Sequence, residues 1–371
     1  MVKKVSIVFL NIRAKAQKGG QEATINNIIN GIKEDYDVIY VGHQSDVNYK
    51  AVKSPFTFLL RLVPIKRGFG KLLRISIFRC LFLRKIKFNC DLIVMNGKSD
   101  YTFLIRNKNL INYSKVLVIK HGKFIKPYPD IITKNKDYRI VVLNSNELHR
   151  LENIYSRKNL RLIRTGIKKD DIEGDMNVRQ KLSIPKNAYL ILSIGRLEET
   201  QKKFSSGIRA IKLAIQNNQN LFYVIVGDGI NKKYYQKLIK KLDLSNNVKL
   251  VGWLSEKDKN GLLKTSNLLL ITSIWETLGL TMVEAFRACL PVLTTKTDGS
   301  TDVIKEDYNG FYTTGEPEDI SNKILMIKNL PKEQIEKITE NAMETAELYS
   351  YDKMIDLYKA TIRELVNDKN Y

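Results

Sequence analysis

Apolar runs of strand length recur along the chain, separated by segments with helical periodicity. In the first half they cover residues 5–10, 37–41, 91–96, 115–122 and 138–145. Short β-rich runs that alternate with helical stretches are typical of a parallel sheet with crossover helices. We therefore predict a doubly wound α/β domain in the first half of the chain.

The same pattern starts again in the second half. Its apolar runs cover residues 189–196, 222–229, 248–253, 267–273 and 291–296. Three further helical segments follow residue 315, and the last of them is amphipathic and needs a surface to cover. The repeated pattern predicts a second doubly wound domain with a helical extension.

A polar, charged segment without long apolar periodicity, residues 168–188, separates the two patterns. A chain of 371 residues also exceeds one ordinary hydrophobic core. We expect Rossmann-like domains at 1–167 and 189–347, joined by a linker at 168–188. A C-terminal helix at 348–371 is expected to pack back on the first domain.

The composition restricts the partners of the protein. A net charge of +23 and a pI near 9.7 predict attraction to phospholipid headgroups, nucleic acid or a phosphate-bearing substrate, and charge alone does not choose among them. Three cysteines without paired spacing and three histidines do not indicate a disulfide framework or a metal site. The first apolar run has strand length and no small-residue cleavage site after it, so we expect a first strand and a cytoplasmic protein.

Ligands of open α/β sheets bind beyond the carboxyl ends of the strands, so we searched the loops that follow the apolar runs. In GGQE, Gly19 and Gly20 would let backbone amides approach an anion at a helix start, although a plain turn fits equally well. In SIGRLEETQKKF, Arg196 and Lys202, with Lys203 beside it, could hold a diphosphate and neutralise its charge. Solvated surface charges are the alternative for these lysines.

Two more loops contain candidate residues. GDG at residues 227–229 lacks the third glycine of a dinucleotide fingerprint and indicates mainly a turn. In ETLGLTMVEAF, eight residues separate Glu276 from Glu284, roughly 12 Å along a helix, so we expect them to bind two parts of one long ligand. Backbone amides at the helix start suit sugar hydroxyls or phosphate oxygens; these belong to Thr277, Leu278, Gly279 and Leu280.

Together these motifs resemble the nucleotide-sugar-dependent glycosyltransferases of family 4, which have the GT-B fold of two Rossmann-like domains facing across a cleft. SIWETLGLTMVEAFRACLPVLTT matches the family's acidic residue, EGFGL turn, second glutamate and GLPV, although the turn here is ETLG. GGQE, IVGDG, VKLVGW and YSYDKMIDLYKATI extend the resemblance over most of the chain. Thr165 to Lys168 replace the family's Asn-Gly-hydrophobic-Asp, and Asp302 stands where a glutamate is common.

The resemblance implies a role for each candidate residue. Arg196 and Lys202 would bind the donor diphosphate; Lys202 is favoured over Lys203 because it stands eight residues before Ala210. Glu284 would accept the ribose hydroxyls, and Glu276 with the nearby amides would hold the donor sugar. Gly19 and Gly20 would lie near the donor, and His121 near the reacting sugar, although a buried core histidine is the alternative. Such enzymes retain anomeric configuration without a protein nucleophile, and no metal or other cofactor is expected.

A basic segment, residues 54–90, contains no acidic residue and interleaves cations with aliphatic and aromatic side chains. Its apolar runs are too short to span a bilayer, and an interfacial segment that docks on the cytoplasmic leaflet fits this pattern. Apolar core with solvated cations is the alternative. The cations of the predicted membrane and acceptor surface are Arg61, Lys66, Arg67, Lys71, Arg74, Arg79, Arg84, Lys85 and Lys87.

The sequence thus predicts a retaining transferase that moves a hexose or N-acetylhexosamine from a nucleotide sugar, most simply a UDP-sugar, to a lipid-linked glycan. We expect peripheral association with the inner face of the cell membrane and a role in cell-surface polysaccharide synthesis. A same-fold epimerase or phosphorylase is the second hypothesis. A basic nucleic-acid-binding protein is the third, and it is disfavoured because no RNA or DNA motif is recognisable.

Overall fold

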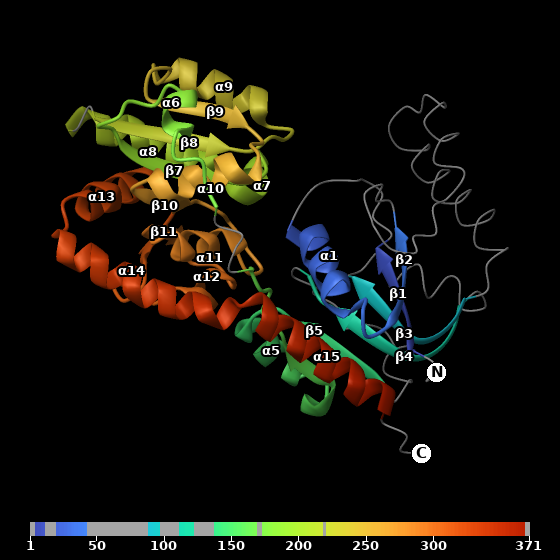
Figure 1. Cartoon of the computed structure of the whole chain (residues 1–371). Helices are drawn as coiled ribbons and strands as arrows, with labels where there is room; N and C mark the ends of the chain where they lie inside the picture. The colour runs from blue at the N-terminus through green and yellow to red at the C-terminus, as the bar shows by residue number, and fades with distance from the viewer. Residues whose placement is uncertain are drawn as a thin grey trace, which may run out of the picture. The chain divides into compact units, whose positions relative to one another are not determined.

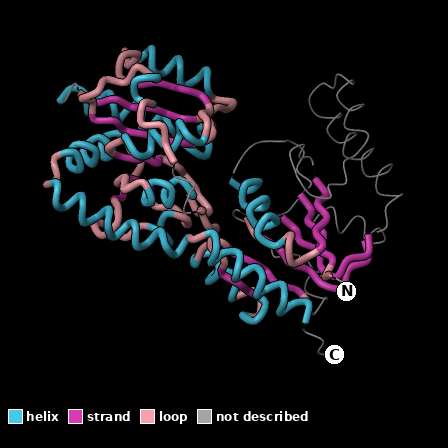
Figure 2. Tube along the Cα trace, viewed as in Figure 1, coloured by secondary structure: helices cyan, strands magenta, loops and turns pink. Residues whose placement is uncertain are grey.

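The computed structural model describes residues 4–11, 20–42, 88–96, 111–121, 137–168, 173–217 and 220–367. The chain divides into two compact units (Figure 1). Unit 1 comprises Met1–Ile163 with Ile355–Tyr371, and unit 2 comprises Arg164–Met354. In each unit helices and strands alternate along the chain, and the strands form a parallel sheet (Figure 2).

Among the described residues, unit 1 has a six-stranded parallel sheet of order β2-β1-β3-β4-β5-β6. Its strands are β1 (Ser6–Asn11), β2 (Asp37–Gly42), β3 (Phe88–Asn96), β4 (Ile111–Ile119), β5 (Tyr138–Val142) and β6 (Leu160–Leu162). Its helices are α1 (Gly20–Ile32), α5 (Ser145–Glu152), the 3₁₀ turn η4 (Arg157–Asn159) and most of α15 (Tyr351–Asn367). The predicted runs at 5–10, 37–41, 91–96, 115–122 and 138–145 correspond to β1 to β5.

Helix α15 returns from the end of the chain and packs on unit 1, alongside β5 in Figure 1. Its Glu364 accepts a hydrogen bond of 2.9 Å from Arg139 of β5 and pairs with Arg161 of β6. Its Ile355 lies against Gly31 of α1, where a Cβ would stand only 2.4 Å from the isoleucine Cδ1. Glycine at this position therefore permits the close approach of two helices that are far apart in sequence.

Unit 2 has a six-stranded parallel sheet of order β12-β11-β10-β7-β8-β9 within the described part of the chain. Its strands are β7 (Tyr189–Ile194), β8 (Leu221–Val226), β9 (Val248–Gly252), β10 (Leu268–Ile271), β11 (Val292–Thr295) and β12 (Phe311–Thr313). Its helices are α6 (Val178–Lys181), α7 (Glu199–Lys202), α8 (Phe204–Asn217), α9 (Lys232–Lys241), α10 (Glu256–Thr265), α11 (Leu280–Arg287), α12 (Ser300–Val303), α13 (Pro317–Lys328), α14 (Lys332–Ala346) and the 3₁₀ turn η5 (Glu347–Tyr349).

Strands β8 and β10 of the unit 2 sheet are buried along their whole length, which explains why their sequences are continuous apolar runs. Leu190 and Leu192 of β7 belong to one core cluster with Phe286 of α11. Ile191, between them, belongs to a second cluster with Ile208 of α8. Successive residues of a strand point to opposite faces, so one strand supplies both cores.

Residues 168–188, expected to be a linker, lie in unit 2 wherever the structure describes them. Val178 and Ile184 are buried in the same core cluster as β7. The change of unit therefore comes earlier, between residues 163 and 164. Just after it, Gly166 lies against Ser350, where a Cβ would stand 2.3 Å from the serine carbonyl oxygen.

The strand order of unit 2 reverses at β7 and β10, which are neighbours in the sheet although β8 and β9 separate them in sequence. In unit 1 the corresponding neighbours are β1 and β3. Ligands of doubly wound folds bind at such switch points, beyond the carboxyl ends of the strands. The loops that follow β7 and β10 are therefore where a ligand of unit 2 is expected.

Candidate functional site

The loop after β7 carries Arg196 and is fixed by the loop after β8. The amide of Gly195 donates to the Val226 carbonyl at 2.9 Å, and the amide of Leu197 donates to the Asp228 carbonyl at 3.0 Å. Gly227 has a φ of +146°, and a Cβ there would stand 1.8 Å from the Gly195 carbonyl oxygen. The first glycine of GDG, interpreted above as part of a turn, thus lets two loops pack backbone to backbone behind Arg196.

Lys202 and Glu276 form a partly buried ion pair at the switch point, although 74 residues separate them in sequence. Their side chains are 15% and 11% exposed. Glu276 also accepts a hydrogen bond of 2.8 Å from the hydroxyl of Ser273, and Thr272 donates to the Lys202 carbonyl at 2.7 Å. Two candidate ligand-binding groups of opposite charge therefore lie in contact, one from each loop.

Lys203 points to a different partner. It follows α7 with a left-handed backbone, φ +46°, and its ammonium lies 3.4 Å from Glu316. Both side chains of this pair are more exposed, 36% and 68%. Of the two adjacent lysines, Lys202 is the one that the structure places beside Glu276.

Arg196 lies partly exposed at the start of the same loop, with 42% of its side chain accessible. Its Nη2 donates to the side-chain oxygen of Gln201 at 3.0 Å, and its Nη1 lies 3.6 Å from Glu198. Gln201 is itself buried. The sequence did not predict this role for Gln201. The position of a glutamine in the sequence does not show whether its side chain contacts an arginine or lies in solvent.

The start of α11 provides backbone donors beside Glu276. Gly279 precedes the helix in a left-handed conformation, φ +70° and ψ +61°, which favours glycine. Amides in the first turn of a helix have no acceptor within it and carry partial positive charge. The side chain of Leu278 is buried in the core, so this residue can contact a ligand only through its backbone. Thr277 and Leu280 are partly exposed.

The segment after β11 packs against this turn. The amide of Gly299 donates to the Glu276 carbonyl at 2.9 Å. A Cβ at Gly299 would stand 2.7 Å from the amide nitrogen of Leu278. A glycine is therefore required where this segment supports the backbone of the Glu276 turn.

Glu284 lies in the second turn of α11 and pairs with a different lysine. Lys259 of α10 lies 3.0 Å from Glu284 and 2.7 Å from Glu256. Burial alone would lower the pKa of Lys259, but Glu284 and Glu256 outweigh it, so the pKa is raised and the ammonium stays charged at neutral pH. Glu276 and Glu284 are thus fixed by separate cations. Lys259 belongs to the candidate site and was not predicted from the sequence.

In unit 1, His121 follows β4 and is buried, with 8% of the residue exposed. Its neighbour Lys120 forms a buried ion pair with Glu147 of α5. The amide of Glu147 donates to the Asn144 side chain at 2.8 Å, which caps the helix. Gly20 is the first residue of α1, whereas Gly19 and all nine predicted membrane-surface cations lie outside the described residues.

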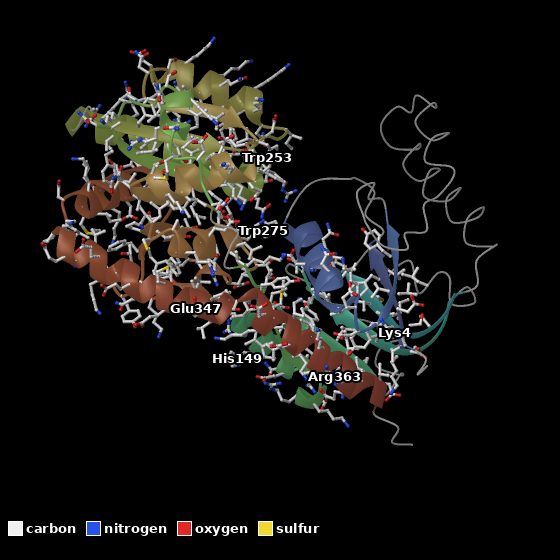
Figure 3. The ribbon with its side chains drawn as sticks, viewed as in Figure 1. Lys4, His149, Trp253, Trp275, Glu347 and Arg363 are labelled. Carbon is white, nitrogen blue, oxygen red and sulfur yellow. The ribbon has the colours of Figure 1, made fainter. Side chains whose placement is uncertain are left out.

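Large apolar side chains are exposed along the carboxyl edge of the unit 2 sheet. Trp253 follows β9 and Trp275 follows β10; both are labelled in Figure 3. They are 54% and 40% exposed, and Ile230, after β8, is 86% exposed. Exposed aromatic rings at such an edge offer surfaces on which a nucleobase or sugar ring can pack.

Two properties of the described residues bear on the predictions. No helix among them is long and apolar enough to cross a bilayer. No group of three or more histidine, cysteine, aspartate or glutamate side chains in these ranges is arranged to hold a metal ion.

Comparison with known proteins shows which proteins this chain resembles. Residues 175–345 match the family described as Glycosyl transferases group 1. The chain is 28% identical over 328 residues to an uncharacterized glycosyltransferase of Methanocaldococcus jannaschii, covering 78% of this chain and 76% of that protein. It is 29% identical over 143 residues to UDP-Gal:alpha-D-GlcNAc-diphosphoundecaprenol alpha-1,3-galactosyltransferase of Escherichia coli, covering 38% of this chain and 36% of that one.

Among solved structures, Anabaena HepE in complex with UDP and glucose superposes with a TM-score of 0.74 at 18% identity, covering 97% of this chain and all of that one. The two parallel-sheet units therefore have the GT-B fold, as the sequence predicted. The group 1 match within unit 2 and the M. jannaschii relative, together with this fold, support a glycosyltransferase.

Proposed function

We propose that the protein is a retaining glycosyltransferase of family 4. It transfers a hexose or N-acetylhexosamine from a UDP-sugar to a lipid-linked glycan acceptor in cell-surface polysaccharide synthesis. The observation that carries this proposal is the cluster of Arg196, Lys202 and Glu276 at the β7–β10 switch point. Cations for a diphosphate and a carboxylate for sugar hydroxyls lie there on adjoining loops.

Arg196 and Lys202 are proposed to hold the diphosphate of the donor. Negative charge develops on the leaving nucleoside diphosphate as the glycosidic bond breaks, and fixed cations stabilise that charge in the transition state. In this proposal the two cations supply the charge neutralisation that a divalent metal gives in other transferases, so no metal cofactor is required.

Donor binding would exchange the partners of the ion pair between Lys202 and Glu276. Lys202 contacts Glu276, and a diphosphate would compete for the same ammonium. Glu276 would then accept hydrogen bonds from the donor sugar, beside the first-turn amides of α11. Glu284, held by Lys259, would accept the ribose hydroxyls, as the acidic residue of dinucleotide folds does.

The transfer step needs no protein nucleophile. The acceptor oxygen bonds to the anomeric carbon on the face from which the phosphate oxygen leaves, and its proton passes to that phosphate oxygen. This retains the anomeric configuration. The role proposed for His121, contact with the reacting sugar, and for Gly19 and Gly20, close approach to the donor, comes from the family resemblance.

The acceptor proposal draws on charge and on a relative. The E. coli relative is named for a diphosphoundecaprenol-linked acceptor, and this chain carries a net charge of +23. We propose peripheral binding to an anionic membrane through the basic segment 54–90, most of which lies outside the described residues. Flotation with anionic liposomes at low salt tests this: neutralising the nine cations should abolish binding, and unchanged flotation would contradict it.

A thermal-shift panel of nucleotide sugars tests the donor site, because at a fixed concentration a ligand of higher affinity stabilises the folded protein more. UDP and one UDP-sugar should raise the melting temperature, and Arg196→Ala and Glu284→Ala should each reduce the increase. Nuclear magnetic resonance of the product should show the anomeric configuration of the donor. No increase with any nucleotide, or an unchanged increase in both variants, would contradict the proposal.

A further inference from the structure

Gln201 joins the two loops of the candidate donor site. It lies in α7, one residue before Lys202, and only 6% of it is exposed. Its side-chain oxygen accepts from Arg196 Nη2 at 3.0 Å, and its backbone carbonyl accepts from the amide of Ile274, after β10, at 2.8 Å. A buried neutral side chain thus holds one candidate phosphate ligand while its backbone anchors the loop of Glu276.

The position of Gln201 is itself fixed from the far side of α7. The carboxylate of Glu199 accepts from the Tyr235 hydroxyl at 2.7 Å and from the Ser205 hydroxyl. The amide of Glu199 donates to the side chain of Asn231 at 3.0 Å. These bonds tie α7 to α8 and α9, so the acceptor that Gln201 presents to Arg196 is set by the core of unit 2.

Arg196 lies between two acceptors of different charge. Gln201, the nearer, is neutral, whereas the carboxylate of Glu198 lies 3.6 Å from Nη1 and is 34% exposed. A guanidinium that pairs fully with Glu198 has its charge cancelled before a diphosphate arrives. A neutral acceptor on the opposite nitrogen orients the group without adding a second negative charge to that of Glu198.

We infer that Gln201 is a positioning residue that holds the guanidinium of Arg196 ready for the donor diphosphate. The inference rests on the proposed function. The site needs an acceptor at residue 201, because removing it frees the arginine to turn toward Glu198. It also needs a neutral acceptor, because a carboxylate would orient the guanidinium but cancel its charge.

Isothermal titration of the full chain with UDP and with uridine tests the inference. Gln201→Met keeps the size of the side chain and removes the acceptor, and should weaken UDP binding about tenfold. Gln201→Glu should weaken UDP binding further, and raising the salt concentration should reduce that additional loss.

Two controls accompany these variants. Uridine lacks the diphosphate, so its affinity should stay within about twofold in both variants. Gln236→Glu, on the exposed surface of α9, is the matched control and should bind UDP as the wild type does.

A double-mutant cycle shows whether Gln201 acts through Arg196. In an Arg196→Ala background, Gln201→Met should cause no further loss of UDP affinity, because no guanidinium remains to be held.

Three results would overturn the inference. They are wild-type UDP affinity in Gln201→Met, equal losses of affinity for UDP and uridine, and unfolding of both Gln201 variants. If the wild type itself binds UDP no better than uridine, the proposed function fails. If Arg196→Ala weakens UDP binding and Gln201→Met does not, only the inference fails.

Discussion

Two lysine–glutamate pairs, one in each unit, lie after parallel strands of the two sheets; the pair in unit 1 is buried and the pair in unit 2 is partly buried. Lys120 follows β4 in unit 1 and pairs with Glu147, while Lys202 follows β7 in unit 2 and pairs with Glu276. The side chains of the first pair are 2% and 10% exposed, and those of the second are 15% and 11%. The chemistry is the same, but the lysine of unit 2 is more accessible.

The surroundings of the two pairs differ more than their burial. In unit 1 the pair joins a strand end to one helix, and Arg150 on that helix also contacts Glu147, at 2.7 Å. In unit 2 the pair joins two loops at a switch point, with Arg196 in one of them. We expect the Lys120–Glu147 pair, which joins a strand to a helix, to stabilise unit 1. The Lys202–Glu276 pair joins two loops at the edge of the sheet where ligands bind, so a ligand can replace one partner of the pair.

The largest expected effect is on stability, at the unit 1 pair. Lys120→Met leaves the buried carboxylate of Glu147 with Arg150 as its remaining cation, so the cost should approach but not exceed the roughly 3–5 kcal/mol of a buried charge that loses all compensation. Hydrogen-exchange mass spectrometry should show faster exchange in peptides from β4 and α5, with UDP binding by the folded protein unchanged. Exchange that stays at the wild-type level would show that the pair does not stabilise unit 1.

The next effect is on ligand binding, at the unit 2 pair. Lys202→Met should weaken UDP binding about tenfold to hundredfold, since a hydrogen bond to a charged group contributes roughly 1.5–3 kcal/mol. Lys203→Met is the matched control: its lysine contacts Glu316, and the change should alter UDP affinity less than about twofold. Isothermal titration measures both. Equal effects would remove the distinction that the structure draws between the adjacent lysines.

A smaller effect is expected at Glu284, which is paired with Lys259 and proposed to bind ribose. The wild type should bind UDP more tightly than 2′-deoxy-UDP, by about fivefold to tenfold, because one hydroxyl hydrogen bond is lost. Glu284→Ala should bind the two nucleotides equally. Competition titrations measure this preference, and a variant that keeps it would exclude Glu284 as the ribose ligand.

The smallest effect concerns a partly exposed ion pair, that of Glu364 with Arg139 and Arg161. Burial raises the pKa of Glu364, but hydrogen bonds from Arg161 and Arg139 outweigh it and hold the pKa below 4.5. A lowered pKa contributes stability above the unfolded value, and that stability is lost as pH falls through the folded value. Glu364→Gln should therefore lower the melting temperature at pH 7 by less than about 3 °C, and by less still near pH 3. A larger loss at pH 3 than at pH 7 would contradict this.

The sequence predicted most of the fold because long apolar runs carry a clear period. It missed β6 and β12, which are three residues each, LRL and FYT, and too short to show one. It also took 168–188 as a linker, since the four-residue helix α6 has no periodicity, although Val178 is buried in the unit 2 core. Elements this short are stabilised by the sheet or core against which they pack, and their own sequences carry little signal.

The site was predictable where strand order decides it. Arg196, Lys202 and Glu276 follow two strands, and the meeting of those strands at a switch point brings them together. Gln201 and Lys259 were not predictable, because their contacts depend on side-chain directions that spacing does not encode. Sequence therefore located the charged groups, and only the structure showed what holds them.

A crystal structure with an intact UDP-sugar analogue tests the central claim most directly. The account predicts the diphosphate within hydrogen-bond distance of both Arg196 and Lys202, with Glu276 turned from Lys202 to the sugar and Glu284 on the ribose. A donor bound away from the β7 and β10 loops, or a Lys202–Glu276 pair unchanged with the donor in place, would contradict it.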